Sequence, residues 1–517
     1  MEENYSKSIQ KSKYNNIKKK SILLLPIICI IGLIIRFYYT PYGIPLILDA
    51  HLGYFLYALD ISILGHLPNY TLSQSGWGEF LSIFFIFFNS DNLIDYHDLQ
   101  RTISVILSGI TVIPIYFICK KFFNNYYSLI GATIFALEPK IIMNSTIGIS
   151  EPLYILAICL GILFFLNYNK KIIYLAFGFF GWVTIIRPEG QFWFLAFSIA
   201  YFIRFRKNRK DLALFFVCLG IFLLVLSPIV MHRIECCQTD GIVSRFTGEI
   251  NNNLNSPTIL LEGKEIPTYA PNFFNGIKLI GWSLIPIFVI FIPFGLIQIF
   301  KNLKFPNYLL IIIPSILALP IIYSVSIAPD TRYVYPIYPI FCVISLFGIR
   351  FIANKFKKEK LFVFIIIISI ILSSIVYIDF KKTDYSNDDE LYEIGKLVLY
   401  DVNGVNKNQE LGKFFKVIEI ENRWPITESN GILKDSLEIK QFEAKDFTSI
   451  EEFIEFGERN GLSHLIIEDN SKTPEFLMNV FKNEEKYNYL IKEFDSSEHG
   501  NNYHVKKFKI DYNMFKK

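Results

Sequence analysis

Long apolar runs, separated by short polar segments, occupy the first three quarters of the chain. An α-helix needs about 17 to 25 apolar residues to cross the hydrocarbon core of a bilayer. Eleven runs are predicted to be membrane spans: 21–37, 101–119, 126–142, 152–168, 172–186, 191–204, 211–231, 277–300, 307–327, 333–352 and 361–378. The run 79–88 is too short to span, so we expect it to lie at the interface or to re-enter the membrane.

The pattern changes after residue 378. Apolar segments at 417–420 and 461–469 and strand-like runs at 489–494 and 503–510 accompany helical stretches at 449–460 and 473–482. A helix that stops at a glycine and is followed by a short apolar strand is typical of α/β domains. Residues 379–517 are therefore predicted to form a small α/β domain after a polytopic α-helical domain at 21–378.

Composition agrees with a membrane protein. The 517 residues are 52% hydrophobic and include 50 Phe, and the charged fraction is 19%. A soluble globular protein carries about 25% charged residues. The mean hydropathy is +0.36. Residues 379–517 hold 20 basic and 28 acidic residues, whereas the preceding part is basic. We expect membrane lipid as a partner and no nucleic acid.

Basic residues predict the orientation in the membrane. Six lysines precede the first run, which by the positive-inside rule holds residues 1–20 in the cytoplasm. Threading eleven spans then places five further basic clusters on the same side: 120–121, 170–171, 204–210, 301–304 and 350–360. The first run lacks a small-residue cleavage site and is predicted to stay as an anchor. The first outer loop, 38–100, and the C-terminal domain are predicted to be extracytoplasmic.

Ionisable residues gather at the predicted outer ends of the spans. Asp49 follows the first span, and Glu138 and Glu151 bracket the turn between the third and fourth spans. Arg187 begins the turn between the fifth and sixth spans, and Arg332 opens the tenth. Bent helix ends that face a cavity are where membrane proteins tolerate buried charge. These residues are the candidates for a functional site.

Each candidate also has a structural interpretation. Arg187 and Arg332 could extend to lipid headgroups. Glu151 could complement the dipole of the helix that it opens, and Asp49 could be a surface-loop acid. His51 and the other histidines are interpreted as structural, because no histidine pair has the spacing of a zinc site.

Four short motifs carry a resemblance to a known superfamily: Asp49–Tyr54, Ser150–Leu153, Arg187–Gly190 and Arg332–Pro339. In their order and their predicted side, they resemble the GT-C superfamily of polytopic glycosyltransferases. The group most similar is the family-39-like one, related to protein O-mannosyltransferases and to the aminoarabinose transferase of lipid A. The chain departs from that pattern at Glu151, where many relatives have Asp, and in the segment 75–79.

The resemblance implies a hexosyltransferase-type enzyme of the cell envelope with a sugar on a polyprenyl phosphate as donor. Asp49 would be the base that takes the proton of the acceptor hydroxyl, with inversion at the anomeric carbon. Arg332, and secondly Arg187, would stabilise the lipid phosphate as it leaves. Glu151 would be the second catalytic acid, and a divalent cation, if one is used, would bind Asp49 and Glu151. The other expected substrate-binding residues are Tyr333, His51, Tyr54 and Glu138.

The acceptor stays open at this point among a protein, a lipid and a glycan. The aromatic-rich segment 66–98 is expected to form amphipathic helices that shape the acceptor groove. A transporter or flippase of lipid-linked sugars is the main alternative, but it would need charges deep in the spans or two related halves. A non-catalytic scaffold whose C-terminal domain binds glycans is the other.

Overall fold

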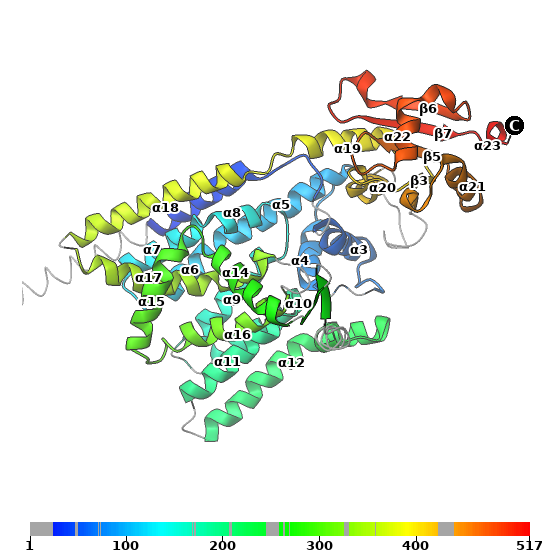
Figure 1. The fold of residues 1–517 in the computed structure, drawn as a ribbon. Coiled ribbons are helices and arrows are strands. Elements are labelled where there is room, and N and C mark those ends of the chain that lie inside the picture. The colour runs from blue at the N-terminus through cyan, green and yellow to red at the C-terminus, as the bar shows by residue number, and fades with distance from the viewer. Residues whose placement is uncertain are drawn as a thin grey trace, which may run out of the picture. The chain divides into compact units, whose positions relative to one another are not determined.

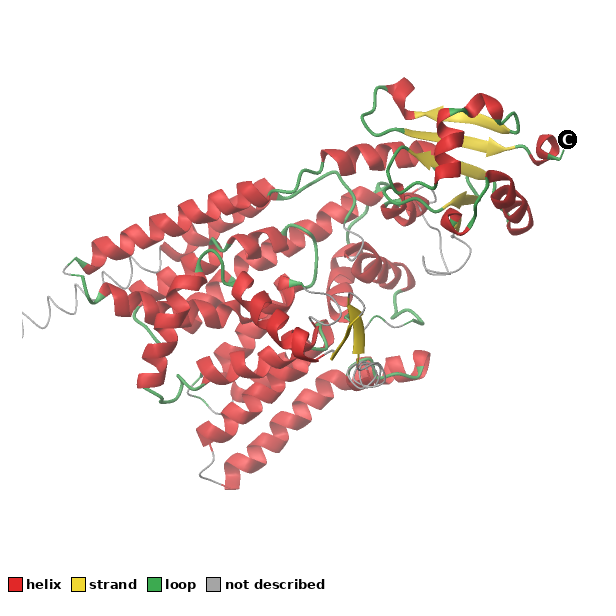
Figure 2. Cartoon of the chain, in the orientation of Figure 1, coloured by secondary structure: helices red, strands yellow, loops and turns green. Residues whose placement is uncertain are grey.

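The computed structural model describes residues 24–46, 50–70, 72, 74–167, 169, 172–205, 209–244, 258–261, 264–267, 269–324, 330–356, 358–421 and 439–516. The chain forms two compact units. Unit 1 comprises Met1–Thr40, Pro68–Leu81 and Gln100–Lys382, and unit 2 comprises Pro41–Leu67, Ser82–Leu99 and Thr383–Lys517. Figure 2 shows that the first unit is almost wholly helical, whereas the C-terminal part contains a sheet. Parts of the segment 38–100, which was predicted to be the first outer loop, thus belong to the same unit as the C-terminal domain.

Helices of unit 1 follow the apolar runs. After the helix Leu24–Tyr39 come α6 (Val112–Cys119), α7 (Asn125–Ala136), α8 (Pro139–Ser145), α9 (Glu151–Phe165), α10 (Ile173–Ile186), α11 (Gly190–Phe205), α12 (Arg209–Cys237), α14 (Tyr269–Ser283), α15 (Phe288–Lys301), α16 (Leu309–Ser324), the 3-10 helix η3 (Thr331–Ile337), α17 (Tyr338–Ala353) and α18 (Glu359–Lys381). The hairpin β1 (Thr258–Leu261) and β2 (Lys264–Pro267) is antiparallel. Helices α4 (Ser75–Phe85) and α5 (Leu93–Ile110) have residues in both units. Figure 1 labels the elements along the chain.

The predicted count of eleven spans is not confirmed. Among the described residues, four helices are long and apolar enough to cross a membrane: Leu93–Cys119, Lys210–Cys237, Thr331–Ala353 and Leu361–Val398. A fifth is possible if the pair Phe274–Ser283 and Phe288–Lys301, bent by 107°, is one span. Other runs form apolar helices of 10–17 residues. The run 126–142 is divided because Pro139 has no backbone N–H to continue α7.

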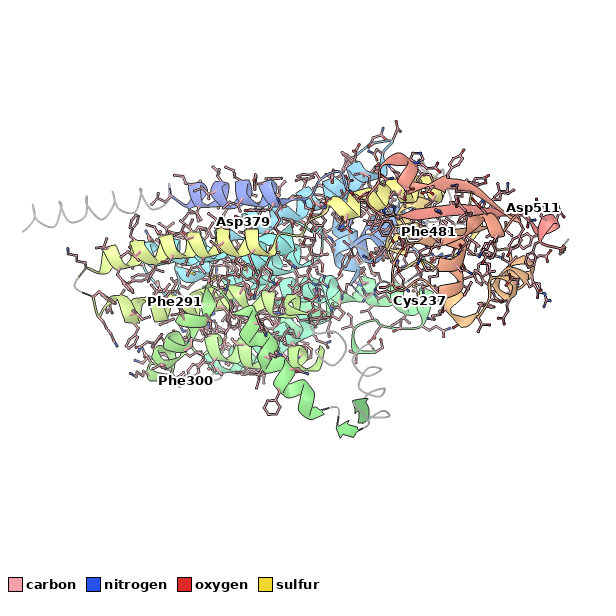
Figure 3. The ribbon with its side chains drawn as sticks, turned by 45° about the horizontal axis from the view of Figure 1, so that its top comes forward. Cys237, Phe291, Phe300, Asp379, Phe481 and Asp511 are labelled. Atoms are coloured by element: carbon pink, nitrogen blue, oxygen red, sulfur yellow. The ribbon has the colours of Figure 1, made fainter. Side chains whose placement is uncertain are left out.

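The exposed apolar faces of α12 and α18 support a membrane environment. Only 17% and 28% of the residues in their most apolar stretches are buried. Leu224 on α12, Val376 on α18 and Phe300 on α15 are all more than half exposed. Figure 3 labels Phe300 on α15 and Asp379 near the end of α18. Soluble proteins rarely expose apolar surface on this scale, so these faces fit contact with lipid.

Glycines allow α15 and α17 to touch. A Cβ added to Gly295 would lie 2.1 Å from the carbonyl oxygen of Ile344, and one added to Gly348 would lie 2.2 Å from that of Phe291. Both obstacles are backbone atoms and cannot rotate away. Small residues at such crossings are the usual means by which membrane helices approach closely.

Arg36 ties the helix Leu24–Tyr39 to two other helices of unit 1. It is completely buried. Its Nε donates to Ser108 Oγ on α5 at 3.0 Å, and one terminal nitrogen donates to the carbonyl oxygens of Gly32 and Ala136 at 2.9 and 2.8 Å. A buried charge is tolerated where hydrogen bonds replace water. They do so at Nε and at one terminal nitrogen, while the other terminal nitrogen is buried without a partner among the described residues.

Unit 2 has a sheet of five strands in the order β4-β3-β5-β7-β6. The strands are β3 (Gly404–Asn406), β4 (Lys440–Phe442), β5 (His464–Glu468), β6 (Leu490–Asp495) and β7 (Val505–Ile510). β3 pairs in parallel with β4 and β5, and β7 pairs antiparallel with β5 and β6. The longer helical elements are η1 (His51–Phe55), α3 (Leu56–Leu64), α19 (Ser386–Val398), α20 (Phe415–Glu421), α21 (Ile450–Asn460), α22 (Glu475–Lys482) and α23 (Tyr512–Phe515).

Most predicted elements of the C-terminal domain are confirmed, including helices α21 and α22 and strands β5, β6 and β7. Ser449 caps α21 by accepting the N–H of Glu452, and Gly461 ends it in a left-handed conformation with φ of 93°. The apolar segment 417–420, to which the sequence pattern assigned no element, lies in α20. There Ile418 packs against Gly395 of α19, so tertiary packing overrides the strand preference of an Ile- and Val-rich run.

Candidate functional site

Glu151 and Arg187 form a buried ion pair in unit 1. A terminal guanidinium nitrogen of Arg187 donates to Glu151 Oε1 at 2.6 Å. Glu151 is 2% exposed and Arg187 is 7% exposed. Glu151 is the first residue of α9, and Pro152 follows it in the first turn. Its second oxygen, Oε2, is buried without a hydrogen-bond partner among the described residues.

A rigid turn sets the direction of Arg187. The residue ends α10 in an extended conformation, with φ −147° and ψ 130°. Its N–H donates to Val183 O at 3.0 Å, and its carbonyl accepts the N–H of Gly190 at 2.8 Å. Gly190 packs on the last turn of α10 so closely that an added Cβ would lie 2.5 Å from the backbone nitrogen of Thr184. Only glycine fits this position without a shift of backbone.

The guanidinium of Arg187 has two carboxylates and two aromatic rings around it. Glu189 Oε2 lies 3.5 Å from its Nε, whereas Glu151 contacts a terminal nitrogen. The guanidinium carbon lies 6.0 Å from the ring centre of Tyr154 and 5.5 Å from that of Tyr333. Rings at these distances attract a cation through the negative charge of their faces.

Arg332 stands at the start of η3. Asp330 caps this 3-10 helix by accepting the Arg332 N–H at 2.8 Å, and its other oxygen also accepts from Nε of Arg332. The side chains of Arg332 and Asp330 are 29% and 27% exposed. Arg332 is therefore more accessible than Arg187, and the acidic partner described for it comes from its own turn.

Both arginines line one pocket of unit 1, which contains about 380 Å³ of space between atoms, part of it open to solvent. Its polar side comes from the α9 to α11 region and from η3. Its apolar side comes from α16. The lining residues are Tyr154, Arg187, Glu189, Trp193, Leu317, Pro320, Ile321, Arg332, Tyr333, Pro336 and Ile337. Two cations beside an apolar wall suit the junction of a charged head and a hydrocarbon chain.

Glu138 is not among the residues that line this pocket. It precedes Pro139 at the start of α8 and is completely buried. Both of its carboxyl oxygens are buried without a hydrogen-bond partner among the described residues. Its expected role in substrate binding stays a prediction.

Asp49, the expected base, lies outside the described residues. His51 and Tyr54 belong to unit 2, where both are buried. His51 Nδ1 is 3.1 Å from Nε2 of His97, and its ring stacks on Phe55. Burial, with a smaller contribution from the positive charge of Lys416, lowers the pKa of His51 to about 3. A neutral histidine in this packing has a structural explanation, and its proposed contact with substrate is untested.

Sequence reasoning missed part of the pocket. Glu189 and Tyr154 stand within or beside the quoted motifs but were given no role, and the apolar wall on α16 carries no motif at all. The separation of one residue between Arg187 and Glu189 was the available signal for their contact. For a cation, no group of three or more His, Cys, Asp or Glu side chains among the described residues could hold a metal ion.

Comparison with known proteins identifies the fold. No protein-family model matches the chain, and no curated protein matches it. Solved structures from Archaeoglobus fulgidus do match. The oligosaccharyltransferase in the apo form has a TM-score of 0.57 at 11% identity, over 87% of this chain and 69% of that one. Its complex with Zn and sulfate has a TM-score of 0.54 at 12% identity, over 86% and 67%.

A third match is archaeal oligosaccharyltransferase AglB in complex with an inhibitory peptide and a dolichol-phosphate. Its TM-score is 0.56 at 12% identity, over 94% of this chain and 74% of that one. At such identities the likeness concerns the fold alone. This chain therefore has a fold similar to that of an archaeal oligosaccharyltransferase, and its assignment to the GT-C superfamily and to the family-39-like group stays a prediction.

Proposed function

We propose that this protein is a multi-pass membrane glycosyltransferase that moves a sugar or glycan from a lipid-phosphate donor to an acceptor on the extracytoplasmic side. The observation that carries the proposal is the pocket in which Arg187 and Arg332 lie beside the apolar residues of α16. A phosphorylated polyprenyl lipid needs both a cationic contact and an apolar wall. The oligosaccharyltransferase fold supports the same conclusion.

Arg332 is the residue that we propose for the lipid phosphate. Departure of the phosphate develops negative charge, and a fixed guanidinium stabilises that charge more in the transition state than in the bound donor. Its partial exposure leaves it within reach of a ligand that enters from the interface. Tyr333, the next residue, lines the same pocket and adds an aromatic surface against which a sugar ring can pack.

Asp49 is proposed as the base that takes the proton of the acceptor hydroxyl, with Glu151 as the second acid. A carboxylate acts in this way when it reaches the hydroxyl within hydrogen-bond distance. Attack from the side opposite the phosphate would invert the anomeric carbon. Oε2 of Glu151 and Oε2 of Glu189 are both buried without a hydrogen-bond partner among the described residues, and we propose that Glu151 Oε2 accepts from a ligand beside the pocket.

A divalent cation fits the chain only in part. One structural neighbour was solved with Zn, and Glu151 Oε2 is an oxygen of the type that binds such ions. A cation held there, with Asp49 as a second ligand, would supply positive charge to the donor phosphate. The described residues alone do not assemble a metal site, so the roles above rest on the chain's own side chains.

For the acceptor, we favour a protein over a lipid or a glycan. Neighbours of similar fold were solved with an acceptor peptide that contains an NVT sequon and with a dolichol-phosphate. We propose that residues 1–20 lie in the cytoplasm and that the C-terminal domain lies outside, as the basic clusters predict.

The test is to incubate the purified protein with a panel of radiolabelled polyprenyl-phosphate and polyprenyl-diphosphate sugars, with acceptor peptides, lipids and glycans offered separately. Transfer of label to one acceptor class is the expected result. The opposite result, label that crosses a vesicle membrane while still attached to its lipid, would replace the transferase by a transporter.

A further inference from the structure

We infer that Arg187 is a positioning residue that holds Glu151 in place and that it is not a ligand of the donor phosphate. The inference deepens the proposed function and rests on it, because it divides the two arginines of the pocket between two tasks. It also gives a reason for the turn 187–190, which the proposed chemistry does not otherwise use.

The carboxylates around Arg187 disfavour the binding of a phosphate there. Its guanidinium contacts Glu151 at 2.6 Å and Glu189 at 3.5 Å, so two carboxylates face one cation. This cation is thus already opposed by acidic side chains before any ligand binds. A phosphate that approached Arg187 would be repelled by both carboxylates at short range, in a buried place where water screens little. Arg332 differs, since it and its described partner Asp330 are both partly exposed, at 29% and 27%, so water screens their charges more.

The neighbours of Arg187 also fix the orientation of its guanidinium. A guanidinium is flat and offers five N–H donors in fixed directions. In Arg187 one terminal nitrogen donates to Glu151 and Nε lies 3.5 Å from Glu189, while the ring centres of Tyr154 and Tyr333 lie within 6.0 Å of the guanidinium carbon. Arg187 is thus fixed by α9, by its own turn and by η3.

Glu151 is the residue whose orientation Arg187 determines. Its Oε1 is fixed by Arg187, whereas its Oε2 is buried without a partner among the described residues. One oxygen of such a carboxylate is held by the arginine, and the other can accept a hydrogen bond from a ligand. Its orientation then depends on the guanidinium, and loss of Arg187 would leave an acid free to turn and buried without its cation.

The test compares Arg187→Gln with Arg332→Gln in two measurements. The first is the Kd of a polyprenyl phosphate without sugar, bound to the purified full chain in lipid nanodiscs. For Arg187→Gln we expect a Kd within about threefold of wild type, and for Arg332→Gln a Kd weakened more than about tenfold, because only Arg332 would lose a charged hydrogen bond to phosphate.

The second measurement is transfer kinetics. We expect Arg187→Gln to lower kcat by about 10²-fold through misplacement of Glu151, with the KM for the donor unchanged. In a double-mutant cycle, Glu151→Gln combined with Arg187→Gln should cost no more than Glu151→Gln alone. Arg187→Lys keeps the charge but not the flat fork, so its kcat should lie between those of wild type and Arg187→Gln.

As a control for correct folding, the thermal unfolding of every variant is measured. If Arg187→Gln alone does not fold, the double variant with Glu151→Gln removes both members of the pair and supplies the binding comparison. The inference is overturned if loss of Arg187 weakens lipid-phosphate binding as much as loss of Arg332, or if the two losses in the cycle multiply.

Failure of the proposed function looks different from failure of this inference. If the wild type binds polyprenyl phosphate and transfers no sugar from any donor, the proposed reaction is wrong, and the Kd comparison still decides what Arg187 does. If the wild type binds no polyprenyl phosphate, both are overturned.

Discussion

Replacement of Gly190 by alanine tests whether the turn 187–190 sets the geometry of the pocket. The new Cβ would lie 2.5 Å from the nitrogen and 2.6 Å from the Cα of Thr184. Since real Cβ atoms are not found so close to backbone, the turn must move away from α10. Arg187 precedes Gly190 by three residues and is joined to it by a hydrogen bond of 2.8 Å, so it must move with the turn.

The expected cost has two parts. Overpacking of a tight interior position costs about 1–3 kcal/mol of folding free energy. Misplacement of a catalytic group by about 1 Å lowers the rate by about 10²-fold, which is about 2.7 kcal/mol in the activation free energy. We expect Gly190→Ala to show both effects, a lower midpoint of thermal unfolding in nanodiscs and a kcat reduced by about 10²-fold.

Gly220→Ala is the matched control. Gly220 lies in α12, and an added Cβ there meets no atom within 4 Å. Alanine favours a helix over glycine by up to about 1 kcal/mol, so this variant should be as stable as wild type or more so, with unchanged transfer. The reasoning is refuted if Gly190→Ala transfers at the wild-type rate, or if the two variants lose activity equally.

Three further predictions concern other parts of the chain. Gly348→Ala should destabilise the protein by about 1–3 kcal/mol, seen in thermal unfolding, because the new Cβ meets the backbone of Phe291; unchanged stability would contradict the described crossing of α15 and α17. Asp330→Asn keeps the cap of η3 but removes the charge that opposes Arg332, so the Kd for polyprenyl phosphate should fall, and a weaker Kd would speak against Arg332 as the phosphate ligand. Since the folded protein holds the pKa of His51 at about 3, below its ordinary value, only the unfolded chain takes up the proton as pH falls below about 6.5. His51 should therefore cost about 1.4 kcal/mol of stability at pH 5.5 relative to pH 7.5, and His51→Gln should remove this part of the pH dependence of unfolding.

Sequence patterns predicted the C-terminal domain well where a helix has its own end signals. Ser449 and Gly461 bound α21 within one residue of the prediction, because capping chemistry is local. The strands β3 and β4 have three residues each, too few to show an alternating pattern, and they were missed. At 417–420 a strand-like composition lies in a helix, since contacts with α19 decide the conformation.

For the membrane part, apolar length was a weaker guide. A window of hydropathy cannot tell one long helix from two short ones, which is why 126–142 was predicted as one span although the chain breaks before Pro139. Contacts between residues far apart in the sequence could not be predicted either. Motif reasoning singled out Glu151 and Arg187 separately, but their contact over 36 positions depends on the packing of α9 against α10.

The central claim is that an acid of the first outer loop removes the proton of the acceptor while the pocket binds the lipid phosphate. The most direct measurement is the rate of sugar transfer from a radiolabelled polyprenyl-phosphate donor by Asp49→Asn and by wild type, with the Kd of polyprenyl phosphate measured on both. The account predicts a rate lowered by about 10²–10⁴-fold with an unchanged Kd. Transfer by Asp49→Asn at the wild-type rate would contradict it.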